Sequence, residues 1–231
     1  TGLDAVTTYV LTVRAYNNGG SNEVVSSVTT LPWPPAAPNN LSVDVLSQTE
    51  IQLTWQDNAD NETGFIIEDC TGPAGCTLVA TTAANTATYV VTNLLANTTY
   101  GFRLTATNIG GNSDSLEAAA TTLKWPPTAP SSLLAVANSQ TEVQLSWTDN
   151  ADNEEGYQVE VCAQSAGAGC GNLTNLPANT TAFTATGLEA VTTYILTVRA
   201  YNNGGSNEVV SSVTTLPWPP AAPSNLSVDV L

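Results

Sequence analysis

Residues 186–205 read TGLEAVTTYILTVRAYNNGG, and this stretch decides the fold. Every second residue from Tyr194 to Ala200 is Tyr, Leu, Val or Ala, which is the spacing of side chains on one face of a β-strand. Leu188 stands six residues before Tyr194, and the Asn-Asn-Gly-Gly sequence at 202–205 is typical of a turn. The stretch therefore predicts a β-strand with one buried face that ends in a tight turn.

The same stretch belongs to a long internal repeat. Residues 1–46 recur at 186–231, an offset of 185 residues, with three differences, which are Asp4/Glu189, Val10/Ile195 and Asn39/Ser224. A weaker half-period of 92 or 93 residues relates Trp55 to Trp147, and Pro38 to Pro130 and Pro223. Two non-identical modules therefore alternate along the chain.

Each module carries further alternating strands. An Ala-Pro pair opens the segments AAPNNLSVDVL (36–46) and TAPSSLLAV (128–136). The next strands alternate as Ile51, Leu53, Trp55 and as Val143, Leu145, Trp147, so one face of each is expected in a core that the Trp ring fills. Short β-branched runs between Asn, Gly and Pro clusters indicate an all-β chain.

The net charge of −16 limits the partners of the chain. Four basic residues stand against twenty acidic ones, so the surface repels the phosphates of nucleic acids and anionic lipid headgroups. No apolar run is long enough to cross a bilayer, so we expect no membrane insertion in this segment. The charge itself is interpreted as a source of solubility and of repulsion between neighbouring copies.

The four cysteines fall into two close pairs, Cys70 with Cys76 and Cys162 with Cys170. Four cysteines allow three connectivities, but loop closure is easiest between near neighbours, so two local disulfides and an oxidising compartment are expected. A metal site is the weaker alternative, because thiolate sites usually include further cysteines or histidines and the chain has no histidine.

This layout resembles the fibronectin type III family. The resemblance rests on the Ala-Pro start, the Trp in the second strand, the Leu-x5-Tyr spacing and the Asn-Gly turns, with DNADNETGF (57–65) similar to the secreted bacterial branch. It covers essentially the whole chain and implies an all-β fold of tandem seven-stranded immunoglobulin-like Greek-key sandwiches in series. The cysteine pairs depart from the typical member.

The repeat and the resemblance together predict the domain organisation. Residues 1–31 would be the C-terminal part of one domain, 34–123 and 126–216 two complete domains, and 219–231 the first strand of the next. The chain is interpreted as a window on a longer repeating polypeptide.

Three similar linkers separate these domains, TTLPWPPAAP (29–38 and 214–223) and TTLKWPPTAP (121–130). Consecutive prolines such as Pro126 and Pro127 fix φ and favour an extended polyproline geometry, which predicts a semi-rigid rod. One Trp recurs at each junction, and these rings are expected to pack between domains (Trp33, Trp125 and Trp218). The alternatives are a ring lying over the edge of its own domain, or a Pro-rich ligand for another module.

Two acidic loops, at 57–62 and 149–154, are candidate calcium-binding sites. Their carboxylates are close in sequence, and calcium takes six to eight oxygen ligands (Asp57, Asp60 and Glu62; Asp149, Asp152 and Glu154). The spacing departs from an EF-hand loop, and Asp and Asn also stabilise turns through their own backbone, so turn chemistry is the preferred interpretation. No other cofactor or metal is expected.

Six Asn-x-Ser/Thr sequons are candidate glycosylation sites, at Asn40, Asn61, Asn97, Asn172, Asn179 and Asn225. Several would arise by chance in a chain this rich in Asn, Ser and Thr, and only a host with the required enzymes would use them.

The sequence offers no catalytic arrangement. Without histidine there is no Ser-His-Asp or Cys-His pair, and the acidic residues sit in equivalent small loops rather than across a cleft. We therefore expect a structural segment of an extracellular filament or surface fibre, with further copies of the repeat in series as partners and some lateral self-association. The alternative is a spacer or binding module of a surface adhesin or of a secreted polysaccharide-degrading enzyme.

Overall fold

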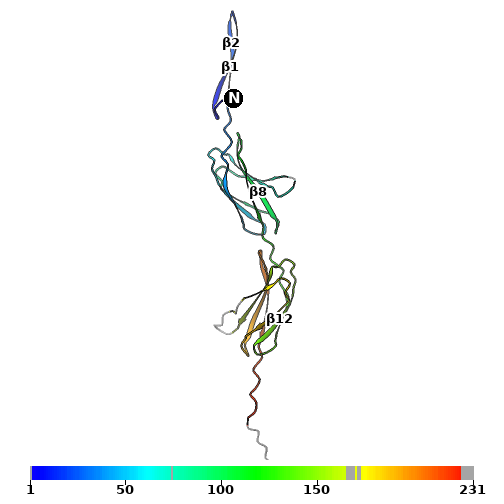
Figure 1. The fold of residues 1–231 in the computed structure, drawn as a ribbon. Coiled ribbons are helices and arrows are strands. Elements are labelled where there is room, and N and C mark those ends of the chain that lie inside the picture. Colours follow the sequence, from blue (N-terminus) through cyan, green and yellow to red (C-terminus); the bar gives the residue numbers. More distant parts are fainter. Residues whose placement is uncertain (1, 74, 165–169, 171–172, 225–231) are drawn as a thin grey trace, which may run out of the picture. The chain divides into compact units, whose positions relative to one another are not determined.

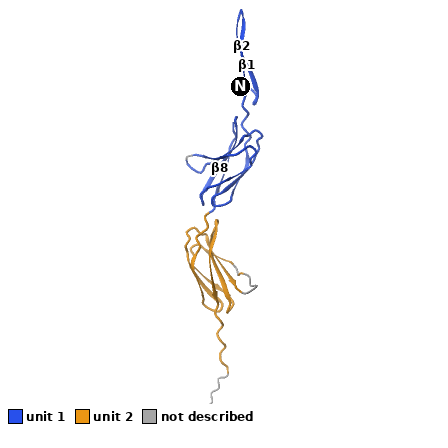
Figure 2. Cartoon of the chain, turned by 180° about the vertical axis from the view of Figure 1, so that it is seen from behind, with its two compact units in different colours: residues 1–123 blue, residues 124–231 orange. Residues whose placement is uncertain are grey.

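The computed structural model describes residues 2–73, 75–164, 170 and 173–224. The chain divides into two compact units, Thr1–Leu123 and Lys124–Leu231 (Figure 2). Each unit contains one sandwich of two antiparallel sheets, and the first unit also contains a separate hairpin (Figure 1). The described residues include no helix long and apolar enough to span a membrane.

The sandwich of the first unit follows the Greek-key pattern. One sheet has the order β3 (Asn39–Val45), β4 (Ile51–Gln56), β7 (Thr88–Val91). The other has the order β10 (Leu116–Thr121), β8 (Thr99–Asn108), β5 (Gly64–Asp69), β6 (Thr77–Thr81), and the short β9 (Gly111–Asn112) pairs with the end of β8. The chain changes sheet between β4 and β5, between β6 and β7, and between β7 and β8.

The second unit repeats this plan. One sheet has the order β11 (Ser131–Ala137), β12 (Glu142–Thr148), β15 (Ala182–Thr186). The other has the order β14 (Thr174–Pro177), β13 (Gly156–Ala163), β16 (Thr193–Asn202), β17 (Gly205–Thr214). The expected all-β architecture of immunoglobulin-like sandwiches is therefore confirmed in both units.

Alternating residues build both cores. Ile51, Leu53 and Trp55 of β4 are buried, and the ring centroids of Trp55 and Phe65 are 5.4 Å apart. In the second unit β12 contributes its alternate residues in the same way, and the ring centroids of Trp147 and Tyr157 are 5.6 Å apart. Each large apolar side chain buried in this way contributes about 1.5–3 kcal/mol.

The Leu-x5-Tyr spacing produces a hydrogen bond that ties a loop to the strand after it. The backbone N–H of Leu95 donates to the Tyr100 hydroxyl oxygen at 2.9 Å, and that of Glu189 donates to Tyr194 at 2.8 Å. The described part of the first 31 residues holds the same bond, from Asp4 N to Tyr9 at 2.7 Å.

Residues 2–31 contain the hairpin of β1 (Thr8–Asn17) and β2 (Gly20–Thr29), which form a two-stranded sheet (Figure 1). At the other end, residues 219–224 lie outside any strand, and 225–231 are outside the described residues. The first strand predicted in 219–231 therefore lies largely outside the described part of the chain.

Candidate functional site at the domain junctions

The linker before each sandwich contains a Trp-Pro-Pro sequence, in which the backbone carbonyl groups outnumber the N–H donors. Proline has no N–H to donate, and the residue before it is pushed toward an extended conformation. The carbonyl groups of Trp33 and Trp125 therefore need partners from outside the linker, and both find them in the sandwich that follows.

In the second unit two asparagine side chains hold the Trp125 carbonyl. Asn153, in the acidic loop, donates to it at 3.0 Å, and Asn202, at the end of β16, donates at 2.9 Å. Asn202 also donates to the Asn153 carbonyl at 3.1 Å and accepts from Gly204 N at 2.7 Å. Asn202 is buried, so these bonds satisfy an amide that would otherwise be costly to enclose.

The first unit has the same arrangement. Asn61 donates to the Trp33 carbonyl at 3.1 Å, and Asn108 donates to it at 2.9 Å. Asn108 also reaches the Asn61 carbonyl at 3.1 Å and accepts from Gly110 N at 2.7 Å. We call each set, a Trp carbonyl with its two Asn side chains, the asparagine clamp.

A glycine beside each clamp lets the linker approach the turn. A Cβ atom on Gly110 would lie 1.9 Å from the Pro32 carbonyl oxygen, and one on Gly204 would lie 1.6 Å from that of Lys124. Since real Cβ atoms do not come so close to an oxygen, any larger residue at either position must displace the linker. These glycines are required by the close approach of the backbone rather than by turn geometry alone.

Further bonds tie the linker to its own sandwich in both units. Asn58 donates to the Ala37 carbonyl at 3.0 Å, and Asn150 donates to that of Ala129 at 2.9 Å. The second unit has three additional contacts: Lys124 N donates to Asn203 Oδ1 at 3.2 Å, Asn207 Nδ2 donates to the Pro127 carbonyl at 2.9 Å, and Lys124 forms an ion pair with Glu155 at 3.0 Å. The clamps therefore belong to a wider set of linker contacts.

The junction Trp rings themselves are exposed. Trp33, Trp125 and Trp218 are 72%, 60% and 66% exposed. Each sandwich thus binds the backbone carbonyl of its junction tryptophan, Trp33 or Trp125, while the side chain stays largely exposed to solvent. Packing of the rings between domains stays a prediction.

The acidic loops use their carboxylates within the fold. Asp57 and Asp149 accept from the backbone N–H two residues later, at 3.0 Å each, which is the turn chemistry favoured from the sequence. Glu62 and Glu154 instead reach across to a neighbouring turn, where they accept from Asn85 N at 3.0 Å and Asn179 N at 3.1 Å.

These bonds direct the Asp and Glu carboxylates of each loop to different partners. Among the described residues, the group of three acid or cysteine side chains with ligand atoms within 4.8 Å of one another is Glu160 with Cys162 and Cys170, whose sulfurs are joined. The structure therefore does not bring Asp57, Asp60 and Glu62 together as three ligands, nor Asp149, Asp152 and Glu154.

One ionisable group differs between the two units. Tyr157 donates to Asp149 Oδ1, and burial, together with that bond and the charges of Asp149 and Glu154, raises the pKa of the Tyr157 hydroxyl well above its usual value near 10. Phe65 occupies the equivalent place in the first unit. Tyr157 therefore stays protonated and anchors its loop.

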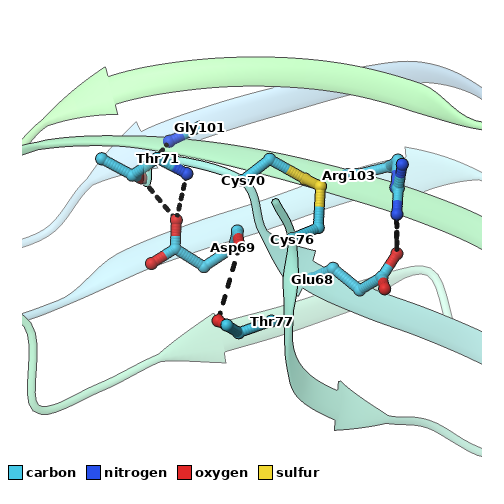
Figure 3. Close-up of a disulfide and its surroundings, with 8 residues drawn as sticks. All are labelled: Glu68, Asp69, Cys70, Thr71, Cys76, Thr77, Gly101 and Arg103. Atoms are coloured by element: carbon cyan, nitrogen blue, oxygen red, sulfur yellow. Dashed lines mark hydrogen bonds and ion pairs between the residues drawn. A yellow bond between two sulfur atoms is a disulfide. The ribbon is translucent and has the colours of Figure 1, made fainter. Parts of the chain in front are cut away.

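Both predicted disulfides are present: Cys70–Cys76 lies between β5 and β6, and Cys162–Cys170 joins the end of β13 to the segment that follows it. Figure 3 shows the first, with the Arg103–Glu68 ion pair at 2.8 Å on one side of it. On the other side the Thr71 hydroxyl accepts from Gly101 N at 2.9 Å. This bridge closes the turn between β5 and β6, and the two bridges together leave no free cysteine among the described residues.

The sequons occupy varied positions. Asn40, Asn97 and Asn179 adopt left-handed backbone conformations with φ near 54°, 50° and 61° and are exposed. Asn61 uses its side-chain amide in the clamp, so a glycan there would compete with the Trp33 carbonyl. Asn172 and Asn225 lie outside the described residues.

Sequence reasoning missed the clamp residues Asn108 and Asn202 and the glycines beside them. They were interpreted only as turn formers, because each partner in the linker lies 75 or 77 residues away in sequence. The signal was the recurrence of Asn-x-Gly-Gly after the Tyr strand in both modules.

Comparison with known families matches residues 36–122 and 128–215 to the Fibronectin type III domain. The chain belongs to the fibronectin type III family. The resemblance drawn from the sequence is thereby confirmed, and the clamped linkers lie at the start of each matched domain.

Several known proteins are similar to this fibronectin type III chain. Exoglucanase B of Cellulomonas fimi is 32% identical over 237 residues, which cover 93% of this chain and 21% of that protein. Chitinase A1 of Niallia circulans is 30% identical over 196 residues, covering 79% of this chain and 26% of that protein. The chain therefore spans only about a fifth to a quarter of the length of these relatives.

Among solved structures, the crystal structure of chicken CNTN1 FN1-FN3 domains matches with a TM-score of 0.51 and 21% sequence identity. The match covers 88% of this chain and 76% of that one. It shows a common fold of tandem fibronectin type III domains.

Proposed function

We propose that this chain is a semi-rigid, non-catalytic spacer segment of an extracellular protein, built from fibronectin type III domains in series. The observation that carries the proposal is the asparagine clamp, which recurs at the start of both complete domains. Fibronectin type III domains are generally non-catalytic modules, and the clamp gives these two a mechanical feature that a flexible tether lacks.

The joint between the two units supports stiffness in a second way. Leu123 is still bonded to the first unit, since its N–H donates to the Ser47 carbonyl at 3.3 Å and its carbonyl accepts from Asn97 N at 3.0 Å. Lys124, the next residue, is already bonded to the second unit through Asn203. The joint therefore has no free linker residue, and the prolines that follow have few conformers to exchange.

The surface charge suits a spacer better than a binder of polyanions. All four basic residues are paired with glutamates, in Arg14–Glu23, Arg103–Glu68, Lys124–Glu155 and Arg199–Glu208. The acidic residues that remain carry the net charge of −16, which disfavours nucleic acid and keeps neighbouring copies apart. The two disulfides favour an oxidising, extracellular location.

NMR relaxation tests the proposal through the rotational tumbling of each unit. In the native chain we expect the two sandwiches to tumble together. Insertion of Gly-Ser-Gly-Ser between Leu123 and Lys124 should shorten the correlation time of each sandwich to about that of a separate domain. Equal correlation times with and without the insertion would show that the native joint is already flexible, and the proposal would be wrong.

The near identity of the long repeat favours a second, more specific candidate, an extracellular filament or surface fibre of many such two-domain units. Forty-three of 46 residues are the same in the two outer copies, which suits one repeating geometry. Electron microscopy of the native full-length protein tests this candidate. An axial periodicity that matches two domains would support it, and a single short stretch of domains beside a catalytic domain would exclude it.

The relatives named exoglucanase and chitinase favour the other candidate, a spacer within a secreted polysaccharide-degrading enzyme. Hydrolysis of cellulose or chitin by the native full-length protein, and its absence in the 231-residue chain, would support that assignment. Both candidates use the same clamped joint.

A further inference from the structure

The turn between β16 and β17 contains Asn203 followed by Gly204. An Asn-Gly dipeptide is prone to spontaneous deamidation, because the backbone nitrogen after the asparagine attacks its side-chain carbonyl carbon and glycine has no side chain to obstruct that attack. The same dipeptide occurs once more in the chain, at 18–19. The equivalent turn of the first unit has Ile109 before Gly110 and lacks it.

The two Asn-Gly pairs lie in turns of the same sequence and the same strand pairing. Both turns belong to the sequence AYNNGGSN, at 15–22 and 200–207, and their flanking residues pair as Asn17 with Gly20 and as Asn202 with Gly205. In each turn the N–H of the reacting glycine donates to the asparagine side chain two residues before it, at 2.7 Å. Since that nitrogen has to lose its proton before it attacks, this hydrogen bond must open first.

The asparagines that accept this bond are held differently. Asn17 is exposed. Asn202 is buried, and its side chain also donates to the Trp125 and Asn153 carbonyls as part of the asparagine clamp. Opening the bond in the second turn therefore disturbs the clamp, whereas opening it in the first releases an exposed side chain.

The linker also contacts both reacting residues of the second turn. The Asn203 side-chain oxygen accepts from Lys124 N at 3.2 Å, and a Cβ on Gly204 would lie 1.6 Å from the Lys124 carbonyl oxygen. A Cβ on Gly19 would meet Asn17 Oδ1, at 3.2 Å, and no linker atom of the described residues. The linker thus restrains both the side chain that is attacked and the nitrogen that attacks it.

We propose that Asn203–Gly204 is a self-modification site whose deamidation is controlled by the clamp. When the linker moves away, hydroxide removes the Gly204 N–H proton, and the nitrogen bonds to the side-chain carbonyl carbon of Asn203. The C–N bond of the side-chain amide breaks, and the departing ammonia takes a proton from water, which regenerates hydroxide. Water then opens the cyclic imide at either carbonyl and leaves aspartate or isoaspartate. Water is the co-reactant, and nothing is oxidised or reduced.

The isoaspartate product acts back on the clamp. In isoaspartate the backbone runs through the side-chain carbons of residue 203, so it is one methylene longer ahead of Gly204. That glycine has no room on the side of Lys124, so the longer turn displaces the linker and keeps an opened joint open. The first unit, with Ile109, cannot undergo this change. The effect on stiffness rests on the proposed spacer, whereas control of the reaction rests on the clamp alone.

Mass spectrometry of the aged chain measures both reactions in the same molecules. Cleavage after Arg14 and Arg199 places the two Asn-Gly pairs in different peptides, and fragmentation locates the mass gain from NH2 to OH. In the folded 231-residue chain at mildly alkaline pH, Asn203 should react about tenfold more slowly than Asn18, because it reacts only from the opened clamp. Equal rates at the two sites would overturn the proposal.

The linker variant, Asn153→Ala with Asn207→Ala, tests the control directly. It removes side-chain hydrogen bonds to two linker carbonyls and leaves both reacting residues in place. The Asn203 rate should rise to about that of Asn18, whose own rate should not change. An Asn203 rate that stays as slow as in the native chain would contradict control by the clamp.

Replacement of Cys162 and Cys170 by serine is the matched control, because it weakens the same unit away from the linker. Cys162 lies opposite Ile195, at the other end of β16 from Asn202. This disulfide variant should raise the Asn203 rate by less than about threefold. Equal acceleration by the linker variant and the disulfide variant would attribute the reaction to general unfolding and overturn the proposal.

Asn203→Ile copies the turn of the first unit and tests the consequence for the joint. NMR relaxation should show independent tumbling of the two sandwiches in the native chain once residue 203 is isoaspartate, and joint tumbling in the equally aged Asn203→Ile chain. Joint tumbling in the fully converted native chain would contradict the effect on the clamp. Independent tumbling in the fresh chain would refute the proposed spacer and leave the difference between the Asn18 and Asn203 rates unchanged, so the two failures are distinguishable.

Discussion

The two complete sandwiches share their core pattern and their clamp but differ in how they hold the loop before β5 or β13. In the second unit Tyr157 donates to Asp149, whereas Phe65 of the first unit has no hydroxyl to offer Asp57. The second unit also adds the Lys124 and Asn207 contacts to its linker. The clamp is thus the common part of the junction, and each domain supplements it differently.

The largest expected effect is common to both units and concerns the glycine beside the clamp. Gly110→Ala and Gly204→Ala should each lower the free energy of unfolding of their own unit by about 2–3 kcal/mol, because the new Cβ must displace a linker carbonyl and, with it, the neighbouring Trp carbonyl that the clamp holds. Urea unfolding of each unit measures this.

Gly101→Ala is the matched control, since its Cβ would meet nothing within 4 Å. It should change the stability of the first unit by less than about 0.5 kcal/mol. Loss of stability at Gly101 as large as at Gly110 would show that glycine replacement, rather than linker displacement, is responsible.

The disulfides should contribute similarly to the two units. They close loops of sequence separation 6 and 8, so the chain-entropy model gives about 2 kcal/mol for each. Replacement of Cys70 and Cys76, or of Cys162 and Cys170, by serine should therefore lower the melting temperature of the affected unit alone. A much larger loss in one unit would mean that its bridge also supports the core.

A smaller effect separates the two units. Tyr157→Phe should destabilise the second unit by about 1 kcal/mol at neutral pH, through loss of the bond to Asp149. Phe65→Tyr tests whether the first unit gains stability by forming the same bond to Asp57.

The same tyrosine should make the second unit sensitive to alkaline pH. Because the pKa of Tyr157 is higher in the folded state than in the unfolded state, its contribution is complete below the unfolded pKa of about 10 and is lost as the pH rises above that value. Urea unfolding at pH 8 and pH 11 should therefore show a larger loss for the native chain than for Tyr157→Phe. Parallel losses in both chains would contradict the assignment.

Much of this architecture follows from sequence patterns with short reach. Alternation at period two identifies the strands and the buried face, the Leu-x5-Tyr spacing identifies the corner, and nearby cysteines identify the bridges. The repeat identifies the modules. Each of these signals lies within a few residues or in the nearly identical recurrence of residues 1–46 at 186–231.

The clamp and the burial of the hairpin depend instead on distant partners. Asn202 meets Trp125 only after the whole sandwich has formed, and no periodicity records that contact. In the acidic loops the preferred interpretation is turn chemistry, and Asp57 and Asp149 make such bonds, but no local pattern records that Glu62 and Glu154 bond to other turns. Likewise, β1–β2 and β16–β17 have almost the same sequence but different burial, because burial is decided by what packs against them.

The most direct test of the account compares the two clamps within one chain by NMR relaxation. Asn153→Ala with Asn202→Ala releases the linker at Trp125, between the two sandwiches, whereas Asn61→Ala with Asn108→Ala releases the linker at Trp33 and leaves that joint intact. Both pairs lose equivalent hydrogen bonds, and melting curves confirm that both sandwiches remain folded at the temperature used. The account predicts that only the first pair makes the two sandwiches tumble independently. Joint tumbling that survives the loss of Asn153 and Asn202 would contradict the claim that the clamp stiffens the junction.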